Sequence, residues 1–249
     1  MLNESPAKRI SLVIPAYNEE QLLPRLLDSV EAAAARYSHG PGAVEVVVAD
    51  NASTDRTAEI ALRRGCRVAT AAKRCIAAAR NAGGSEAKGE IVGFVDADMQ
   101  IHPGTFDAIE RALASPRIIG GATGGTMERW SLGLVVTFAI AVPFVWLTQF
   151  DTGVVFCRRA DFLTVGGYDE SLRVAEDVNF LLALRTLGGR RGQRLRRLRA
   201  VKSIASARKF DEHGDWHYLT MFPKVMLEYL RNGRKGLGKY ESYWYEPKR

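Results

Sequence analysis

Short runs of apolar, β-branched residues recur through the first hundred residues of the chain. Ile10–Ala16 (ISLVIPA), Val44–Ala49 (VEVVVA) and Ile91–Val95 (IVGFV) are the clear examples, and Arg67–Thr70 is a weaker one. Runs this short, dominated by Val and Ile, are typical of strands that are buried on both faces of a sheet. The pattern therefore predicts three strands in this half of the chain and favours a fourth.

Segments with helical spacing separate these runs. Glu19–Arg36 carries its apolar residues at intervals of three and four, while Asp55–Arg64 and Arg74–Ala87 are Ala-rich and similar. Strands alternating with helices predict parallel strands joined by right-handed crossovers. We therefore expect an α/β, Rossmann-like fold with a central, mostly parallel sheet flanked by helices. Ligands of such sheets bind beyond the carboxyl ends of the strands.

The second half of the chain is organised differently. Gly153–Cys157 is typical of a strand, and Val174–Leu187 and Trp216–Leu230 are typical of helices. No internal repeat and no linker-like change of composition divides the chain. We expect one domain over residues 1–210, followed by a helical extension over residues 211–249 that packs on it or faces a membrane or a partner.

An apolar stretch, Leu132–Phe150, contains no charged residue. Its length approaches the roughly 20 residues that span a bilayer, but it contains Pro143 and Gln149 and has no second such segment to return the chain. A spanning helix is therefore not expected. Two interpretations remain: a helix buried beneath the acceptor site, which we favour, or an exposed apolar surface that meets a membrane or a lipid-linked acceptor.

Composition and charge narrow the range of partners. The formal net charge is +7, so anionic partners are favoured: phosphorylated small molecules, acidic lipids or nucleic acid. The basic run Arg190–Arg199 fits any of these, or a solvated face, but no nucleic-acid-binding module is present, and we expect no nucleic acid. The three cysteines are scattered and predict no disulfide framework. The first residues lack the apolar core of a signal peptide, which predicts a cytoplasmic protein, with peripheral contact at the inner face of the membrane as an alternative.

Carboxylates follow two of the predicted strands. Asp50 ends the second strand, and Asp96 and Asp98 end the third in the sequence GFVDAD. If the chain stays extended there, two residues that are two apart share one face of the strand. Carboxylate oxygens are the ligands that Mg²⁺ and Mn²⁺ prefer, so the pair predicts a metal site; a solvated turn is the alternative.

Six short motifs occur in order along the chain. They are Pro15–Glu20 (PAYNEE), Asp50–Asp55 (DNASTD), Arg80–Gly83 (RNAG), Asp96–Asp98 (DAD), Gly166–Glu170 (GGYDE) and Glu176–Asp177. In this series the chain resembles family 2 glycosyltransferases, the inverting group with the glycosyltransferase A fold, from about Ser11 to Lys209. Each motif is weak alone, but six in order are specific.

The resemblance implies a nucleotide pocket. Pro15, Tyr17 and Glu19 would line it, and Asp50 would accept a hydrogen bond from the base or the ribose. Arg80 would lie near the base and near the DAD motif. A helix start for Glu19 and a surface position for Arg80 are the structural alternatives.

The resemblance also implies a metal site with Mn²⁺ or Mg²⁺. Asp98 would be the main ligand, Asp96 would contact the metal or the ribose, and Ala97 would lie between them. A late histidine, His213, would complete the set. Arg208, or the lysine that follows it, would meet the diphosphate of the donor.

The resemblance assigns a general base to Asp177. Inversion by a single displacement needs one carboxylate to take the proton of the attacking acceptor hydroxyl. Because adjacent helical residues diverge by about 100°, we expect Glu176 to face another way. A stabilised helix N-terminus is the alternative explanation of both acids.

Together these features predict a metal-assisted, inverting glycosyltransferase that moves a sugar from a UDP- or GDP-sugar to an acceptor hydroxyl. The acceptor is open, and a lipid-linked one is among the alternatives. A non-catalytic membrane-surface or scaffold protein on the same fold is the main rival. A nucleotidyltransferase is disfavoured because PAYNEE replaces its Gly-rich loop, and a dehydrogenase because no GxGxxG follows the first strand.

Overall fold

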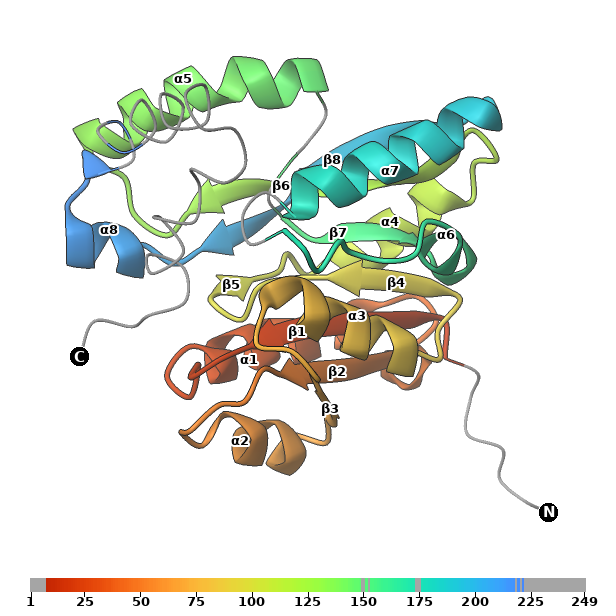
Figure 1. The fold of residues 1–249 in the computed structure, drawn as a ribbon, viewed down its shortest axis with the longest axis horizontal. Helices are drawn as coiled ribbons and strands as arrows, with labels where there is room; N and C mark the ends of the chain where they lie inside the picture. The colour runs from red at the N-terminus through yellow and green to blue at the C-terminus, as the bar shows by residue number, and fades with distance from the viewer. Residues whose placement is uncertain are drawn as a thin grey trace.

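A computed structural model describes residues 8–148, 151, 153–172, 176–217, 219 and 221, with residues 141–148 described by their backbone. Its eight strands form one sheet in the order β3-β2-β1-β4-β7-β6-β8-β5 (Figure 1). The strands of the first half are β1 (Ile10–Ala16), β2 (Val44–Asp50), β3 (Arg67–Thr70), β4 (Ile91–Phe94) and β5 (Met99–Gln100). Those of the second half are β6 (Ile118–Met127), β7 (Val155–Arg158) and β8 (Arg194–Ala205).

The sheet is parallel where the sequence predicts it and mixed beyond. β2 pairs in parallel with β1 and β3, and β1 pairs in parallel with β4. β7 then runs antiparallel to both β4 and β6, β8 runs parallel to β6, and the short β5 is antiparallel to β8. The α/β fold class is confirmed, and each antiparallel pairing involves β7 or β8.

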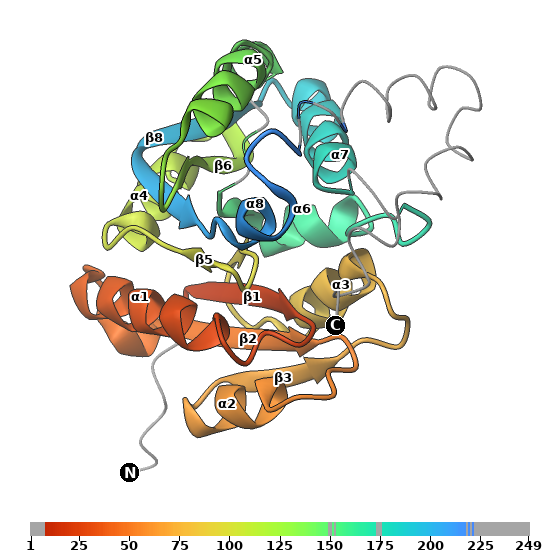
Figure 2. The same ribbon diagram turned by 90° about the vertical axis from the view of Figure 1, so that its left-hand side faces the viewer.

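Helices cover both faces of the sheet (Figure 2). On one face lie α1 (Leu23–Arg36) and α4 (Thr105–Leu113), whose buried residues form a core with β1 and β2. The other face packs α3 (Ile76–Glu86), α6 (Arg159–Thr164) and α7 (Glu176–Arg190). The remaining elements are α2 (Thr57–Arg63), a 3-10 turn η1 (Pro41–Ala43), α5 (Leu132–Thr148) and α8 (Arg208–His213). The boundary expected at residue 210 falls within α8, and most of the helix predicted at 216–230 lies outside the described residues.

The apolar stretch forms α5, and its described side chains correct our preference for a buried helix. Leu134 packs with Met127 and Phe210, but Leu132 and Ile140 keep 72% and 65% of their surface exposed. In Figure 1 the helix lies along the outside of the fold, away from the sheet. None of the described helices combines the length and apolarity that crossing a bilayer requires.

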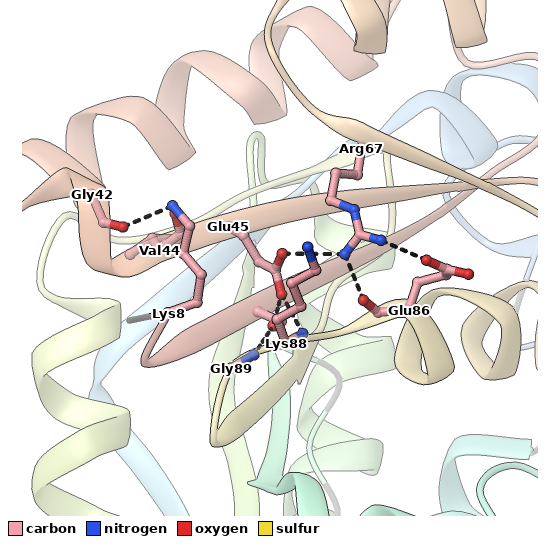
Figure 3. A network of polar contacts seen from close by, with 9 residues as sticks. Lys8, Gly42, Val44, Glu45, Arg67, Glu86, Lys88 and Gly89 are labelled. Atoms are coloured by element: carbon pink, nitrogen blue, oxygen red, sulfur yellow. Dashed lines mark hydrogen bonds and ion pairs between the residues drawn. The ribbon is translucent and has the colours of Figure 1, made fainter. Parts of the chain in front are cut away.

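A network of hydrogen bonds and ion pairs links neighbouring elements at the amino-terminal ends of the parallel strands (Figure 3). Glu45, at the start of β2, accepts hydrogen bonds from the Ser11 hydroxyl and the Lys88 backbone N–H. Arg67 contacts Glu45 at 3.4 Å and also donates to the Glu86 carbonyl at 2.6 Å. These bonds lower the pKa of Glu45 below its ordinary value, although burial alone would raise it.

Candidate active site

The two loops that follow β1 and β2 are joined to each other by hydrogen bonds. Asn18 adopts a left-handed backbone conformation (φ 53°), and its side-chain oxygen accepts from the Thr54 N–H at 2.8 Å. Ser53 in turn accepts from the Asn18 N–H at 3.0 Å, and Asp55 from the Glu20 N–H at 3.0 Å. The PAYNEE and DNASTD motifs thus build one surface.

The residues predicted to line a nucleotide pocket lie on or beside this surface. Pro15 is buried in β1 opposite Ala49, and Asp50 ends β2, where its carboxylate accepts from the Ser53 N–H at 3.3 Å. The Tyr17 ring is covered by the Arg74 guanidinium, 4.3 Å from its centroid. Glu19 receives two hydrogen bonds from Arg208, at 2.7 and 3.0 Å. No sequence motif indicated that Arg74 would contact Tyr17, because this contact depends on how the loop between β3 and α3 folds.

The DAD motif forms a turn, which corrects the expectation of an extended strand end. β4 ends at Phe94, and the Met99 N–H donates to the Asp96 carbonyl at 3.1 Å. Ala97 is buried within the turn, and the Ser206 N–H donates to the Asp98 carbonyl at 3.1 Å, which ties the turn to the start of α8. Burial raises the pKa of Asp98 to about 6, and the negative charge of Asp96 adds to the effect.

The buried side chain of Arg80 connects the DAD turn to the first turn of α7. It projects from α3 with 3% of its surface exposed, and its Nη2 donates to Asp96 at 2.7 Å. Its Nη1 contacts Glu176 at 2.9 Å and Asp177 at 2.7 Å. The prediction that Glu176 faces away from the site is wrong, because both acids lie at the first turn of α7 and one guanidinium reaches both. Proximity of Arg80 to the DAD motif, however, is confirmed.

Asp177 is partly exposed to solvent. Its Oδ1 is fully covered, whereas the side chain as a whole keeps 38% of its surface exposed. Burial raises the pKa of Asp177 to about 7; Arg80 opposes the rise, and Asp96 and Glu176 add to it. A partly exposed carboxylate with a pKa near neutrality can accept a proton.

The GGYDE turn fixes α3 against the segment that precedes α7. Gly166 and Gly167 both take positive φ, 80° and 73°, which glycine adopts without strain. Asn81, next to Arg80, donates to the Tyr168 carbonyl at 2.9 Å and accepts from the Tyr168 N–H at 2.8 Å. The buried Tyr168 ring lies under the Arg80 guanidinium at 5.1 Å. Two motifs that are distant in sequence therefore hold one arginine in place.

Cations face the DAD carboxylates from the start of α8. Lys209 interacts with the charges of both Asp98 and Asp96, and burial lowers its pKa despite them. His213 is oriented differently, because its Nδ1 lies 3.1 Å from the Lys209 carbonyl and its ring packs 4.8 Å from that of His217. Across the part of the chain that the structure describes, no three His, Cys, Asp or Glu side chains are grouped as metal ligands. Asp96, Asp98 and His213 are therefore not assembled as a set.

Asp96 and Asp98 on their own suit a hard divalent cation. They supply carboxylate oxygens, and the negative charge of Asp96 adds to the effect of burial in raising the pKa of Asp98, a repulsion that a dication would relieve. Mg²⁺ is commonly held by one or two carboxylates together with substrate phosphates, so a third protein ligand is not required.

Comparison with known proteins identifies the family. Residues 11–149, more than half of the chain, match the model of glycosyl transferase family 2, and the chain belongs to that family. The undecaprenyl-phosphate 4-deoxy-4-formamido-L-arabinose transferase of Pseudomonas paraeruginosa is 36% identical over 142 residues, 52% of this chain and 41% of the relative. The enzyme of that name from Aeromonas hydrophila is 31% identical over 138 residues, with the same two shares. The chain thus spans less than half the length of these relatives.

Solved structures support the fold. Mannosyltransferase PcManGT from Pyrobaculum calidifontis, in complex with GDP-Man and Mn²⁺, has a TM-score of 0.64 at 22% identity, covering 88% of this chain and 64% of that one. Residues 1–349 of S. aureus TarS, in complex with UDP-GlcNAc, give 0.60 at 20% identity, covering 80% and 58%. The predicted family and glycosyltransferase A fold are confirmed. The individual roles of the site residues stay predictions.

Proposed function

We propose that this chain is the catalytic unit of an inverting glycosyltransferase that uses a UDP- or GDP-sugar. The observation that supports this most directly is the grouping of Asp96, Asp98, Arg80 and Asp177 at the carboxyl edge of the sheet. The bonded loops after β1 and β2 provide the adjoining surface for a nucleotide, and related folds have been solved with UDP-GlcNAc and with GDP-Man and Mn²⁺.

In the proposed step the acceptor oxygen attacks C1 of the sugar, the bond from C1 to the diphosphate oxygen breaks, and the acceptor proton passes to Asp177. Asp96 and Asp98 would hold Mn²⁺ or Mg²⁺, which when bound would offset charge on the departing diphosphate. Lys209 and Arg208 lie on the same side as these carboxylates and would orient the phosphates. Arg208 is bonded to Glu19, so it would have to exchange that partner for a phosphate oxygen.

A lipid phosphate is the acceptor that the relatives favour, because both are named as undecaprenyl-phosphate transferases. A phosphate monoester has a second pKa of about 6 and is largely dianionic at neutral pH, so its oxygen attacks with little help from a base. The exposed apolar residues of α5 would suit contact with the surface of the membrane that holds such an acceptor. Location at the inner face of that membrane stays a prediction.

Calorimetric titration of UDP, GDP, UDP-GlcNAc and GDP-mannose, each with Mn²⁺ and with EDTA, tests the donor half of the proposal. Metal-dependent binding of one nucleotide is expected. Transfer assays would follow with radiolabelled donor and undecaprenyl phosphate in detergent micelles, and separately with hydroxyl acceptors. A folded protein that binds none of these nucleotides in the presence of metal would point instead to the non-catalytic alternative.

A further inference from the structure

Arg80 touches both halves of the candidate site. Its Nη2 contacts Asp96 on the donor side at 2.7 Å, and its Nη1 contacts Asp177, the proposed base, also at 2.7 Å. A single planar guanidinium thus fixes the separation and orientation of two carboxylates that come from the β4–β5 turn and from α7. Lysine could not do this, because its ammonium is a point charge without the planar fork.

The surroundings of Arg80 restrict it to this position. The buried Tyr168 ring lies against the guanidinium and is itself stacked on the buried Phe180 ring at 4.3 Å. The Glu176 carboxylate accepts a hydrogen bond from Nη1 at 2.9 Å. Together with Asp96 and Asp177, three carboxylates therefore surround one buried cation. Among the described residues Nε has no hydrogen-bond partner, so the guanidinium is held from its Nη side. A buried arginine held in this way has little freedom to leave and bind substrate directly.

We propose that Arg80 is the positioning residue of the site, holding Asp177 at a fixed place relative to Asp96 while Glu176 anchors the guanidinium. This rests on the proposed function insofar as Asp177 is the base, but the contacts themselves do not. Arg80 keeps Oδ1 of Asp177 engaged, so the carboxylate is held in the same orientation for each acceptor. Positional errors of about 1 Å can cost about 100-fold in rate, which is the scale of effect expected here.

The test is Arg80→Lys, which keeps the charge and loses the fork. With the donor and a hydroxyl acceptor found in the screen above, kcat should fall by roughly 10- to 100-fold while KM for the donor and the calorimetric affinity for nucleotide change by less than about threefold. With undecaprenyl phosphate, whose oxygen is already ionised, the fall in kcat should be smaller. Arg67→Lys is the matched control, because Arg67 also bridges two carboxylates, Glu45 and Glu86, but at the opposite edge of the sheet. The control should alter the melting temperature and leave kcat unchanged. Equal losses of kcat and nucleotide affinity in Arg80→Lys would overturn the proposal.

A second measurement separates this inference from the proposed function. In metal-free protein carrying ¹³C-labelled aspartate carboxyl groups, the Asp177 resonance is assigned by its loss in Asp177→Asn. Its titration midpoint should move to higher pH in Arg80→Lys; an unmoved midpoint would show that Arg80 does not act on Asp177. If wild-type protein binds no nucleotide, the proposed function fails, but this titration still decides whether Arg80 holds Asp177.

Should Arg80→Lys fail to fold, Glu176→Gln takes its place. The amide keeps an acceptor oxygen for Nη1 but weakens the ionic hold on the guanidinium. A several-fold fall in kcat at unchanged nucleotide affinity is expected from the looser anchor. A wild-type kcat in a folded Glu176→Gln protein would overturn the proposal.

Discussion

Arginines and carboxylates meet at both ends of the parallel strands, but the carboxylate pKa values shift in opposite directions at the two ends. At the amino-terminal edge, the single buried carboxylate of Glu45 receives hydrogen bonds from Ser11, Lys88 and Arg67, and its pKa is lowered (Figure 3). At the carboxyl edge, Arg80 faces three carboxylates, and the pKa of Asp177 is raised to about 7.

The number of hydrogen-bond donors that reach each carboxylate explains why the two pKa values shift in opposite directions. Hydrogen bonds that stabilise the charged form lower a carboxylate pKa, whereas burial and like charges raise it. The amino edge supplies enough donors to outweigh burial, and the carboxyl edge does not. Groups with such perturbed pKa values concentrate at functional sites, so the contrast marks the carboxyl edge as the place for chemistry and the amino edge as a structural joint.

Asp177→Asn should show the largest effect. Loss of a positioned general base costs typically about 100- to 10,000-fold in rate, and we expect a fall of that order in kcat with a hydroxyl acceptor. Nucleotide affinity should stay near that of wild type, since we propose that Asp177 acts on the acceptor. Transfer assays and calorimetry on the same preparation measure both quantities.

The acceptor class sharpens this prediction. If undecaprenyl phosphate is the acceptor, its oxygen is already ionised at neutral pH, and Asp177→Asn should cost far less than with a hydroxyl acceptor. Loss of nucleotide affinity equal to the loss of rate would remove Asp177 from the role of base. The matched comparison is Glu45→Gln, which should leave kcat unchanged.

Asp98→Asn should show the next largest effect, on metal-dependent binding. Removing one of the two proposed carboxylate ligands should lower nucleotide affinity in Mn²⁺ by roughly 10- to 100-fold, by analogy with the cost of disturbing metal-site residues. Affinity in EDTA should change little, so the difference between the two conditions is the informative measurement. Wild-type affinity in Mn²⁺ would place the metal elsewhere or exclude a metal from donor binding.

The sequence predicted the parallel half of the fold because its strands are short runs of buried β-branched residues. β1 and β3 begin and end where the pattern placed them. β6 was not predicted, since glycines interrupt it; a Cβ at Gly120 would lie 2.6 Å from the Phe156 carbonyl, so close strand packing requires glycine there. β8 was not predicted because its basic residues hide the alternation: Leu195 is buried between exposed Arg194 and Arg196, and Val201 is buried next to exposed Lys202.

The candidate site was also predicted only in part from the sequence. Motif order predicted that Arg80, Asp96 and Asp177 belong to one site, and the first two are in contact. That one guanidinium would serve three carboxylates could not be predicted, because it depends on how α3 docks against α7 and on the bonds of Asn81 to the GGYDE turn. His213 shows the reverse case, since its place in the sequence suggested a ligand and its ring is turned toward the carbonyl of Lys209.

Glu45→Gln should have a smaller effect, on stability. The amide keeps the shape of the side chain but cannot accept every hydrogen bond that the carboxylate receives, and it leaves Arg67 without its buried partner. A cost of about 1–3 kcal/mol in the free energy of unfolding is expected for a disrupted buried hydrogen-bonded charge. Urea denaturation at pH 7 measures it. A variant as stable as wild type would show that the amino-edge network contributes no net stability.

The pH dependence of stability should differ in sign between the two edges. The folded-state pKa of Asp177, about 7, exceeds the ordinary carboxylate value, so the folded protein holds a proton that the unfolded chain releases. Its contribution is therefore present at low pH and is lost as the pH rises through about 7. The folded-state pKa of Glu45 is lowered, so its contribution is present above the ordinary value of 4.5 and is lost as the pH falls below it.

Unfolding free energies of wild type, Asp177→Asn and Glu45→Gln between pH 5 and pH 8, all in EDTA, separate these two contributions. Relative to wild type, Asp177→Asn should gain stability as the pH rises through 7, because the variant no longer carries a buried charge among like charges. Glu45→Gln should show a constant deficit over the same range, since Glu45 is ionised throughout. Parallel curves for Asp177→Asn and wild type would mean that Arg80 fully compensates Asp177, and the electrostatic contrast between the two edges would then disappear.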